Sequence, residues 1–185
     1  MKALTLCAAL LGALLMPQTA TAERYRIDPV HSVVVFRVTH FNVGAFYGLF
    51  RKVSGHFVVD GRRSSVEIKV AAASVFTANR KRDTHIKSPD FLNVKQFPSI
   101  TFKSTKVRPA GRTFVVRGKL TLHGVTRAVK VKMRRIGAGK DAWGKYRSGF
   151  EGKLTINRSV YGMKKMKGAV GDKITLTIAV EGIRK

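Results

Sequence analysis

The chain has 185 residues, of which 36 are Lys or Arg and 10 are Asp or Glu, so its formal net charge is +26. Such a charge attracts polyanions, among them anionic lipid headgroups, nucleic acids and acidic cell surfaces, although adaptation to an unusual external pH or a genomic bias would also explain it. The only cysteine is Cys7, which excludes an intrachain disulfide framework and cysteine-ligated metals, and the length suits one domain.

The first 22 residues have the pattern of a secretory signal. Lys2 precedes an apolar run over residues 3–16, and the small residues Ala20 and Ala22 suit cleavage before Glu23. The apolar run is shorter than the roughly 20 residues that span a bilayer, which argues against a membrane anchor. The sequence therefore predicts a signal peptide at 1–22, one mature domain at 23–185, and a periplasmic or secreted location.

Alternation of apolar and polar side chains predicts an all-β domain with eight strands, because a period of two places one set of side chains on each face of a sheet. The expected strands cover residues 32–40, 55–60, 66–72, 100–105, 114–122, 129–134, 146–156 and 173–181. Turn sequences such as Asp60-Gly61 and Gly171-Asp172 separate them. Strands at this spacing indicate a sandwich or a closed barrel, and a barrel leaves no exposed edge strands.

Residues 77–98 break the alternation. Asn79 is a suitable cap for a short helix through Arg82 and His85, and Ser88-Pro89-Asp90 would begin a second helix. Asp83 is expected to pair with a basic neighbour. The two helices would cross one end of the barrel and act as a lid or a plug.

A barrel of eight strands either fills its interior with side chains or holds a small ligand, and alternation alone leaves both interiors open. Glycines at inward positions (Gly55, Gly118 and Gly152) and inward phenylalanines favour a cavity, although strand glycines also mark bulges and barrel corners. The side chains expected to line it are Phe36, Val38, Phe57, Phe102, Phe114, Val116, Leu120, Phe150, Leu154, Ile156, Leu176 and Ile178. Arg82, Asp83 and His85 are expected near its opening.

Several motifs together resemble the YceI-like, polyisoprenoid-binding family. They are Tyr25-Arg26-Ile27-Asp28-Pro29-Val30-His31-Ser32, Phe36, His40, Ser74-Val75-Phe76-Thr77, Arg82-Asp83-Thr84-His85, Ser88-Pro89-Asp90-Phe91, Phe97-Pro98-Ser99-Ile100-Thr101-Phe102, Gly118-Lys119-Leu120-Thr121-Leu122-His123-Gly124-Val125-Thr126 and Asn157-Arg158-Ser159. The resemblance implies a lipocalin-like antiparallel barrel whose internal tunnel binds isoprenoid quinones or polyprenyl phosphates in an exported protein. Val160 and Tyr161 depart from the Asp-Phe pair frequent in the family, and Lys164-Lys165-Met166-Lys167 is unusually basic. A basic opening would suit an anionic headgroup better than a neutral quinone ring.

Other chemistry finds little support in the sequence. The five histidines (His31, His40, His56, His85 and His123) lack metal-binding spacing, so neither a metal nor a cofactor is expected. Ser74 and Ser88 lack the glycine frame of a hydrolase nucleophile, and catalysis is not expected. Nucleic-acid binding is not expected either, because most aromatic side chains face inward.

The hypothesis is therefore non-covalent binding of an isoprenoid-type lipid (a polyprenyl chain, quinone or polyprenyl phosphate), for transport or storage in the periplasm. The alternative is a basic envelope-associated protein with a packed barrel core, which binds anionic lipid or polymer through its surface. An anionic membrane surface and a homodimer remain open as partners.

Overall fold

The computed structural model describes residues 22–185, so the predicted signal peptide lies, except for its last residue, outside the described residues. Eleven strands form one sheet. They are β1 (Glu23–Ile27), β2 (Val33–His40), β3 (Gly44–Phe50), β4 (Val53–Val59), β5 (Ser65–Ala71), β6 (Val75–Phe76), β7 (Ser99–Ala110), β8 (Thr113–Leu122), β9 (Val125–Lys140), β10 (Tyr146–Asn157) and β11 (Val170–Arg184). Within residues 22–185, no helix has the length and apolar character needed to cross a bilayer.

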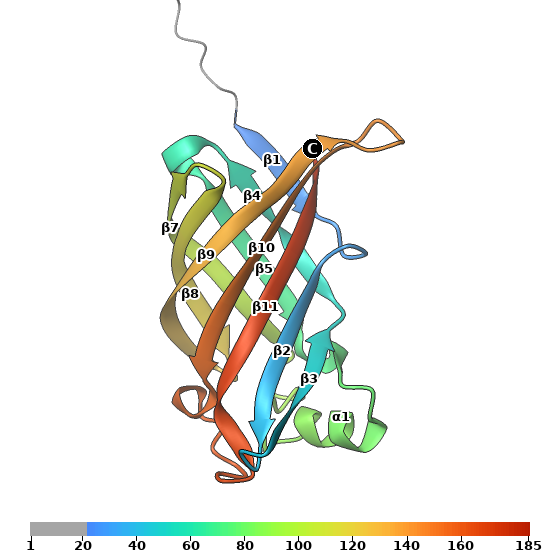
Figure 1. Ribbon diagram of the computed structural model, residues 1–185, viewed down its shortest axis with the longest axis vertical. Helices are drawn as coiled ribbons and strands as arrows, with labels where there is room; N and C mark the ends of the chain where they lie inside the picture. Colours follow the sequence, from blue (N-terminus) through green and yellow to red (C-terminus); the bar gives the residue numbers. More distant parts are fainter. Residues whose placement is uncertain (1–21) are drawn as a thin grey trace, which may run out of the picture.

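Eight of these strands close into an antiparallel barrel (Figure 1). The ring runs β1-β4-β5-β7-β8-β9-β10-β11, and pairing of Arg26 with Ile183 joins β11 back to β1. The predicted eight-stranded barrel is thus confirmed. One member of the ring differs from the prediction, because β1 closes it while β2 continues the sheet beyond β11 into β3 and β6.

A bend at residues 28–32 explains how β1 and β2 share a partner. β1 pairs with the end of β11 and with β4, whereas β2 pairs with the earlier part of β11 and with β3. The backbone N–H of Asp28 donates to the Glu181 carbonyl at 2.8 Å, and the Glu181 N–H donates to the Ser32 hydroxyl at 3.0 Å. These bonds satisfy the backbone at the bend and keep both strands in the barrel wall.

The alternation of apolar and polar residues in the sequence corresponds to inward and outward side chains in the barrel wall. In β8, Phe114, Val116 and Leu120 are buried, whereas Arg117 and Lys119 are exposed. Outward lysines and arginines on one face and inward apolar side chains on the other fix the register, because a slip of one residue would exchange the two faces.

The first predicted lid helix is present, and the second prediction is wrong. α1 (Arg80–Lys87) begins after Asn79, whose Oδ1 accepts from the Arg82 backbone N–H at 2.9 Å. The segment after Ser88 forms turns instead of a helix: the Leu92 N–H bonds back to the Ile86 carbonyl, and Asn93 has a left-handed φ of 44°. This tight reversal carries Phe91 and Leu92 to the barrel interior. The remaining short helices are the 3-10 turns η1 (Gly61–Arg63), η2 (Ala72–Ser74) and η3 (Arg158–Tyr161).

The inward glycines do not leave gaps in the wall, which corrects the expectation drawn from them. A Cβ at Gly118 would collide with the Phe102 ring and the Lys103 carbonyl, and one at Gly152 would collide with Met133. Gly55 has a φ of 134° and lies against the Glu67 backbone. These positions are therefore close approaches between neighbouring strands, and Gly118 lies beside the bulge between Ser104 and Lys106.

Candidate ligand-binding tunnel

The barrel encloses a cavity of about 530 Å³. Cavities of a few hundred to a thousand Å³ with apolar walls are typical of small-molecule sites. All twelve apolar side chains named from the sequence border this cavity. The barrel core is therefore not fully packed, and we call this cavity the tunnel.

The exposure of the inward side chains shows where the tunnel is open. Leu154, Leu176 and Ile178 point inward but are only half-buried, because they face the empty space. Phe114 and Val116 also border the space but are packed more tightly by their neighbours. The first group has room for added contacts with a ligand.

Four aromatic side chains pack together inside the barrel, toward the end where β1 lies. The Tyr25 and Phe57 rings stack at 4.8 Å, and Phe150 meets both Phe57 and Phe114 edge-on at 5.3 Å. Burial, with the hydrogen bond to Glu23, raises the pKa of Tyr25 to about 12, so this hydroxyl stays neutral at ordinary pH. Phe57, Phe114 and Phe150 of this group border the tunnel, so the wall there is aromatic.

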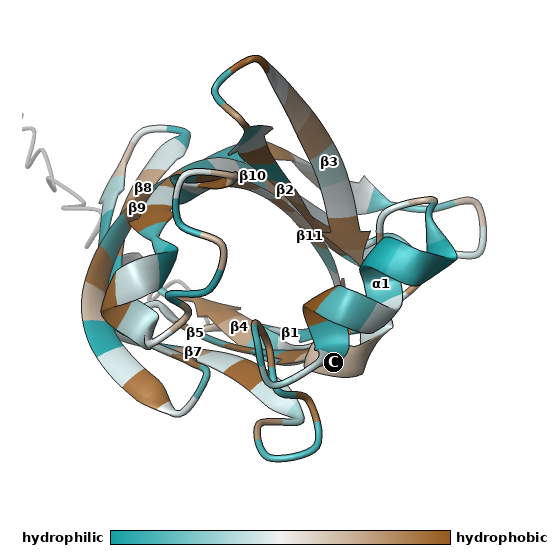
Figure 2. Cartoon of the chain, turned by 90° about the horizontal axis from the view of Figure 1, so that it is seen from below, coloured by the Kyte–Doolittle hydropathy of each residue, from teal (hydrophilic) through white to brown (hydrophobic). Residues whose placement is uncertain are grey.

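The opposite end, where α1 lies, is the rim that we call the mouth (Figure 2). The mouth consists of the following tunnel-bordering residues: His40, Gly44, Ala45, Arg82, His85 and Met166. The Arg82 guanidinium lies over the Phe46 ring, with Cζ 4.8 Å from its centroid. His85 Nε2 lies 3.0 Å from Asp90 Oδ2. The mouth therefore combines an apolar interior with polar, cationic groups at its edge.

Arg82 and Asp83 hold the same residue, Thr77. Arg82 donates from Nε to the Thr77 hydroxyl at 2.8 Å and from Nη2 to the Thr77 carbonyl at 2.7 Å. Asp83 Oδ1 accepts from the Thr77 N–H at 2.8 Å and from its hydroxyl at 2.6 Å. Asp83 does not border the tunnel, and among residues 22–185 it forms no ion pair, so its expected pairing with a basic neighbour is wrong. Arg82 and His85 lie at the mouth as expected, and Asp83 attaches α1 to the wall.

Arg158 is a buried cation beside the tunnel that the sequence marked only within a motif. Its guanidinium donates to three backbone carbonyls, those of Gly171 at 3.0 Å, Met163 at 2.6 Å and Val170 at 2.9 Å. Burial lowers its pKa. Arg158 thereby fixes the segment that joins η3 to β11 at the mouth.

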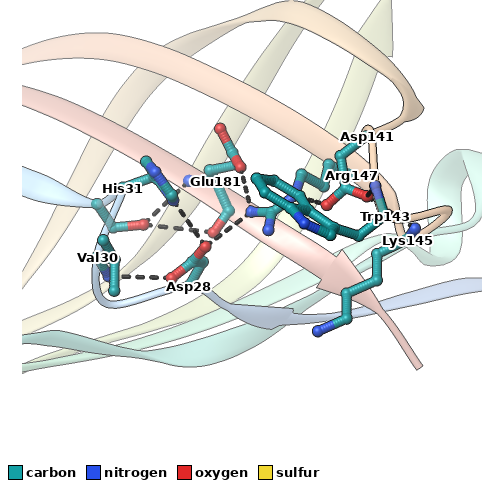
Figure 3. Close-up of polar contacts among 9 residues, drawn as sticks. Asp28, Val30, His31, Asp141, Trp143, Lys145, Arg147 and Glu181 are labelled. Atoms are coloured by element: carbon teal, nitrogen blue, oxygen red, sulfur yellow. Dashed lines mark hydrogen bonds and ion pairs between the residues drawn. The ribbon is translucent and has the colours of Figure 1, made fainter.

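A polar cluster lies at the bend between β1 and β2 (Figure 3). Asp28 Oδ2 accepts from His31 Nδ1 at 2.8 Å and from Arg147 Nη1 at 2.7 Å, and the same guanidinium contacts Glu181 and Asp141 at 2.6 Å. The His31 hydrogen bond, aided by Arg147, holds the pKa of Asp28 far below its usual range. Alternation gives no signal for this partnership, because Arg147 and Glu181 sit among ordinary outward residues.

The ligand atoms of Asp28, His31 and Glu181 lie within 4.8 Å of one another, a spacing that a metal ion could use. Both carboxylates already accept from Arg147, and three hydrogen bonds use the two oxygens of Asp28. These contacts explain the cluster as a set of ion pairs that holds the bend between β1 and β2 against β10 and β11.

Comparison with known proteins agrees with this architecture. A model described as the YceI-like domain matches residues 25–182. A UPF0312 protein of Azotobacter vinelandii is 41% identical over 191 residues, covering 100% of this chain and 97% of the relative. The crystal structure of Burkholderia cenocepacia BcnA has a TM-score of 0.75 and 25% identity, covering 84% of this chain and 98% of that one. A polyisoprenoid binding domain from Saccharophagus degradans, implicated in plant cell wall breakdown, has a TM-score of 0.68 and 14% identity, covering 87% of this chain and 98% of that one.

Proposed function

The chain belongs to the YceI-like domain family, and from this membership we propose that its tunnel binds an isoprenoid-type lipid without a covalent bond. The observation that carries the proposal is the tunnel itself, which twelve inward apolar side chains border and which reaches the mouth. The description of the Saccharophagus degradans domain as polyisoprenoid-binding points to the same ligand class.

The energetics suit a long apolar ligand. Each buried CH₂ group contributes roughly 0.8 kcal/mol, so a chain of about 15 to 20 carbons reaches micromolar affinity after the cost of association. The methyl-branched chain of an isoprenoid would lie against half-buried side chains that border the tunnel, among them Leu154, Leu176 and Ile178. Binding of this kind needs no catalytic group.

The mouth favours an anionic headgroup over a neutral one. Arg82 lies at the rim, and Lys164 and Lys167 line a smaller surface hollow next to Arg158. A phosphate would meet these cations, whereas a quinone ring would gain little from them. A polyprenyl phosphate is therefore the preferred member of the ligand class.

The proposed role is transport or storage of the lipid in the periplasm, where the predicted signal peptide would deliver the protein. The salt dependence separates this role from simple surface adhesion. Tunnel binding tolerates high salt, whereas binding through surface charge is screened by it.

The test is mass spectrometry of an organic extract from protein purified gently from the periplasm in high salt. We expect one polyprenyl species at near one-to-one stoichiometry. A chain without lipid, or with a broad mixture at trace level, would contradict the proposal.

A further inference from the structure

Two loops project beyond the mouth and carry exposed apolar side chains. The β2–β3 turn presents Phe41 and Val43, which are 59% and 93% exposed, and the loop before β11 presents Met166, which is 40% exposed. The Phe41 N–H donates to the Ala169 carbonyl at 2.8 Å, so the loops are joined. Figure 1 shows both at the lowest part of the molecule, at the end where α1 lies.

The backbone of these loops is unusual for such side chains. Phe41, Asn42 and Met166 have left-handed φ angles of 50°, 55° and 54°. The Val43 N–H donates to the His40 carbonyl at 3.1 Å, so Phe41 and Asn42 are the central residues of a turn within the three-residue β2–β3 connection. Turns with positive φ at both central residues ordinarily use Asn, Asp or Gly there, and a bulky residue costs free energy. The Phe41 ring packs edge-on against His40, with centroids 4.5 Å apart, yet it stays 59% exposed, so its display to solvent at a strained position is a feature to explain by function.

Cations surround the apolar tips. Lys164, Lys165 and Lys167 are exposed in the same loop as Met166. None of the three forms an ion pair within the described part of the chain. Asn42 borders the surface hollow that Lys164 and Lys167 line, which places these lysines next to the β2–β3 turn. Apolar tips within a group of lysines match a bilayer surface that carries anionic phospholipid, because such a surface rewards insertion and positive charge together.

The same loops form part of the tunnel rim. Met166 borders the tunnel, as do His40 and Gly44 on either side of the β2–β3 turn. We infer that Phe41, Val43, Met166 and the three lysines dock the mouth against an anionic phospholipid bilayer, so that the tunnel opens onto the membrane surface. The inference rests on the proposed function, because docking would serve to bring the lipid site to the membrane. Vesicle binding measures docking whether or not the tunnel holds a lipid.

The experiment is co-sedimentation of the purified protein with vesicles of phosphatidylcholine, with and without phosphatidylglycerol. One variant, F41S/V43S, removes the apolar tips, and another, K164Q/K165Q/K167Q, removes the charge. We expect the first to weaken binding to anionic vesicles at least about tenfold and the second about 100-fold. Wild-type protein should bind phosphatidylcholine vesicles far more weakly.

Matched controls place equal changes elsewhere on the barrel. W143S removes an 81% exposed apolar side chain from the β9–β10 turn at the opposite end, and K119Q/K130Q/K132Q removes three outward charges from β8 and β9. Both should bind anionic vesicles within about threefold of the wild type, because neither Trp143 nor these three lysines border the tunnel or its mouth.

Three results would overturn the inference. They are equal losses in the mouth and control variants, wild-type binding that does not depend on phosphatidylglycerol, and no vesicle binding at all. Mass spectrometry of bound lipid, on the same variants, separates the two proposals. A mouth variant that still holds lipid but has lost vesicle binding supports docking. An empty wild-type tunnel contradicts only the proposed function.

Discussion

Asp28 and Arg147 lie 119 positions apart in the sequence, and their side chains form an ion pair of 2.7 Å between Oδ2 and Nη1. The pair fastens the bend between β1 and β2 to β10, and Glu181 of β11 accepts from the same guanidinium nitrogen. The Asp28-Pro29-Val30-His31-Ser32 motif therefore stabilises the bend between β1 and β2, the two strands that pair with different parts of β11.

Replacement of Asp28 by Asn should lower the free energy of unfolding by about 1.5–3 kcal/mol at neutral pH, since a buried charge-assisted network loses its anion. The pKa of Asp28 is lower in the folded chain than in the unfolded chain. Its ionisation therefore stabilises the fold above about pH 4, and this contribution falls as the pH drops toward the folded-state pKa. Urea unfolding should show the difference between wild type and variant shrinking in acid, and a constant difference would contradict this account.

Replacement of Leu176 by Trp should reduce the lipid recovered from the protein severalfold, because the larger ring fills part of the tunnel. The matched control is Thr177→Trp, whose side chain lies on the outer face of the same strand, where Thr177 pairs with Lys153 and Val35. Mass spectrometry of extracts from both proteins measures the effect. Equal lipid content in the two variants would show that ligand does not occupy this part of the barrel.

Replacement of Gly118 by Ala should destabilise the barrel by about 1–3 kcal/mol, since the added methyl group overlaps the Phe102 ring and the Lys103 carbonyl. Gly137→Ala is the control, because a Cβ at that position meets no atom within 4 Å. Thermal unfolding of the two variants should separate them clearly. Similar melting temperatures would mean that the strands at Gly118 move apart at little cost.

Replacement of Asp83 by Ala should loosen α1, because Thr77 loses the acceptor of both its N–H and its hydroxyl. We expect faster amide hydrogen exchange over residues 80–87, by about tenfold or more for the loss of two such bonds. Thr84→Ala changes an exposed residue of the same helix that bonds only within it, and it should leave exchange nearly unchanged. Unaltered exchange in the Asp83 variant would assign the attachment of α1 to Arg82 alone.

The barrel could be predicted because its strands have a polar, solvent-exposed outer face and an apolar inner face over many residues. β8 alternates strictly between side chains such as Arg117 and Val116, and the strand predicted at 114–122 differs from it by one residue. The sequence does not predict β3, since Gly44, Ala45 and Gly48 give little alternation and both of its faces are partly exposed. β1 was missed although Tyr25 and Ile27 alternate with arginines, because five residues are too few to stand out.

The sequence predicts which residues line the site, but it does not predict the shape of the cavity between them. The twelve apolar residues follow from the inner faces of β2, β4, β7, β8, β10 and β11, but the cavity between them depends on how the strands close. Glycines were misleading, because Gly152 makes room for Met133 and leaves no gap. The roles of Arg147 and Arg158 come from partners distant in sequence or from backbone carbonyls, which no local pattern reveals.

From the position of β11 we expect the ring to close late in folding. β11 is the last strand, yet it pairs with β1, β2 and β10, and the Lys185 N–H donates to the Arg24 carbonyl at 2.9 Å. Without its final residues the chain has no ring, and the apolar inner faces of the earlier strands remain open to water. Pairings this distant in sequence form slowly, so each newly made chain passes through a period in which these faces can associate with other chains. The lipid binding proposed above therefore requires that β11 has first paired with β1 and closed the ring.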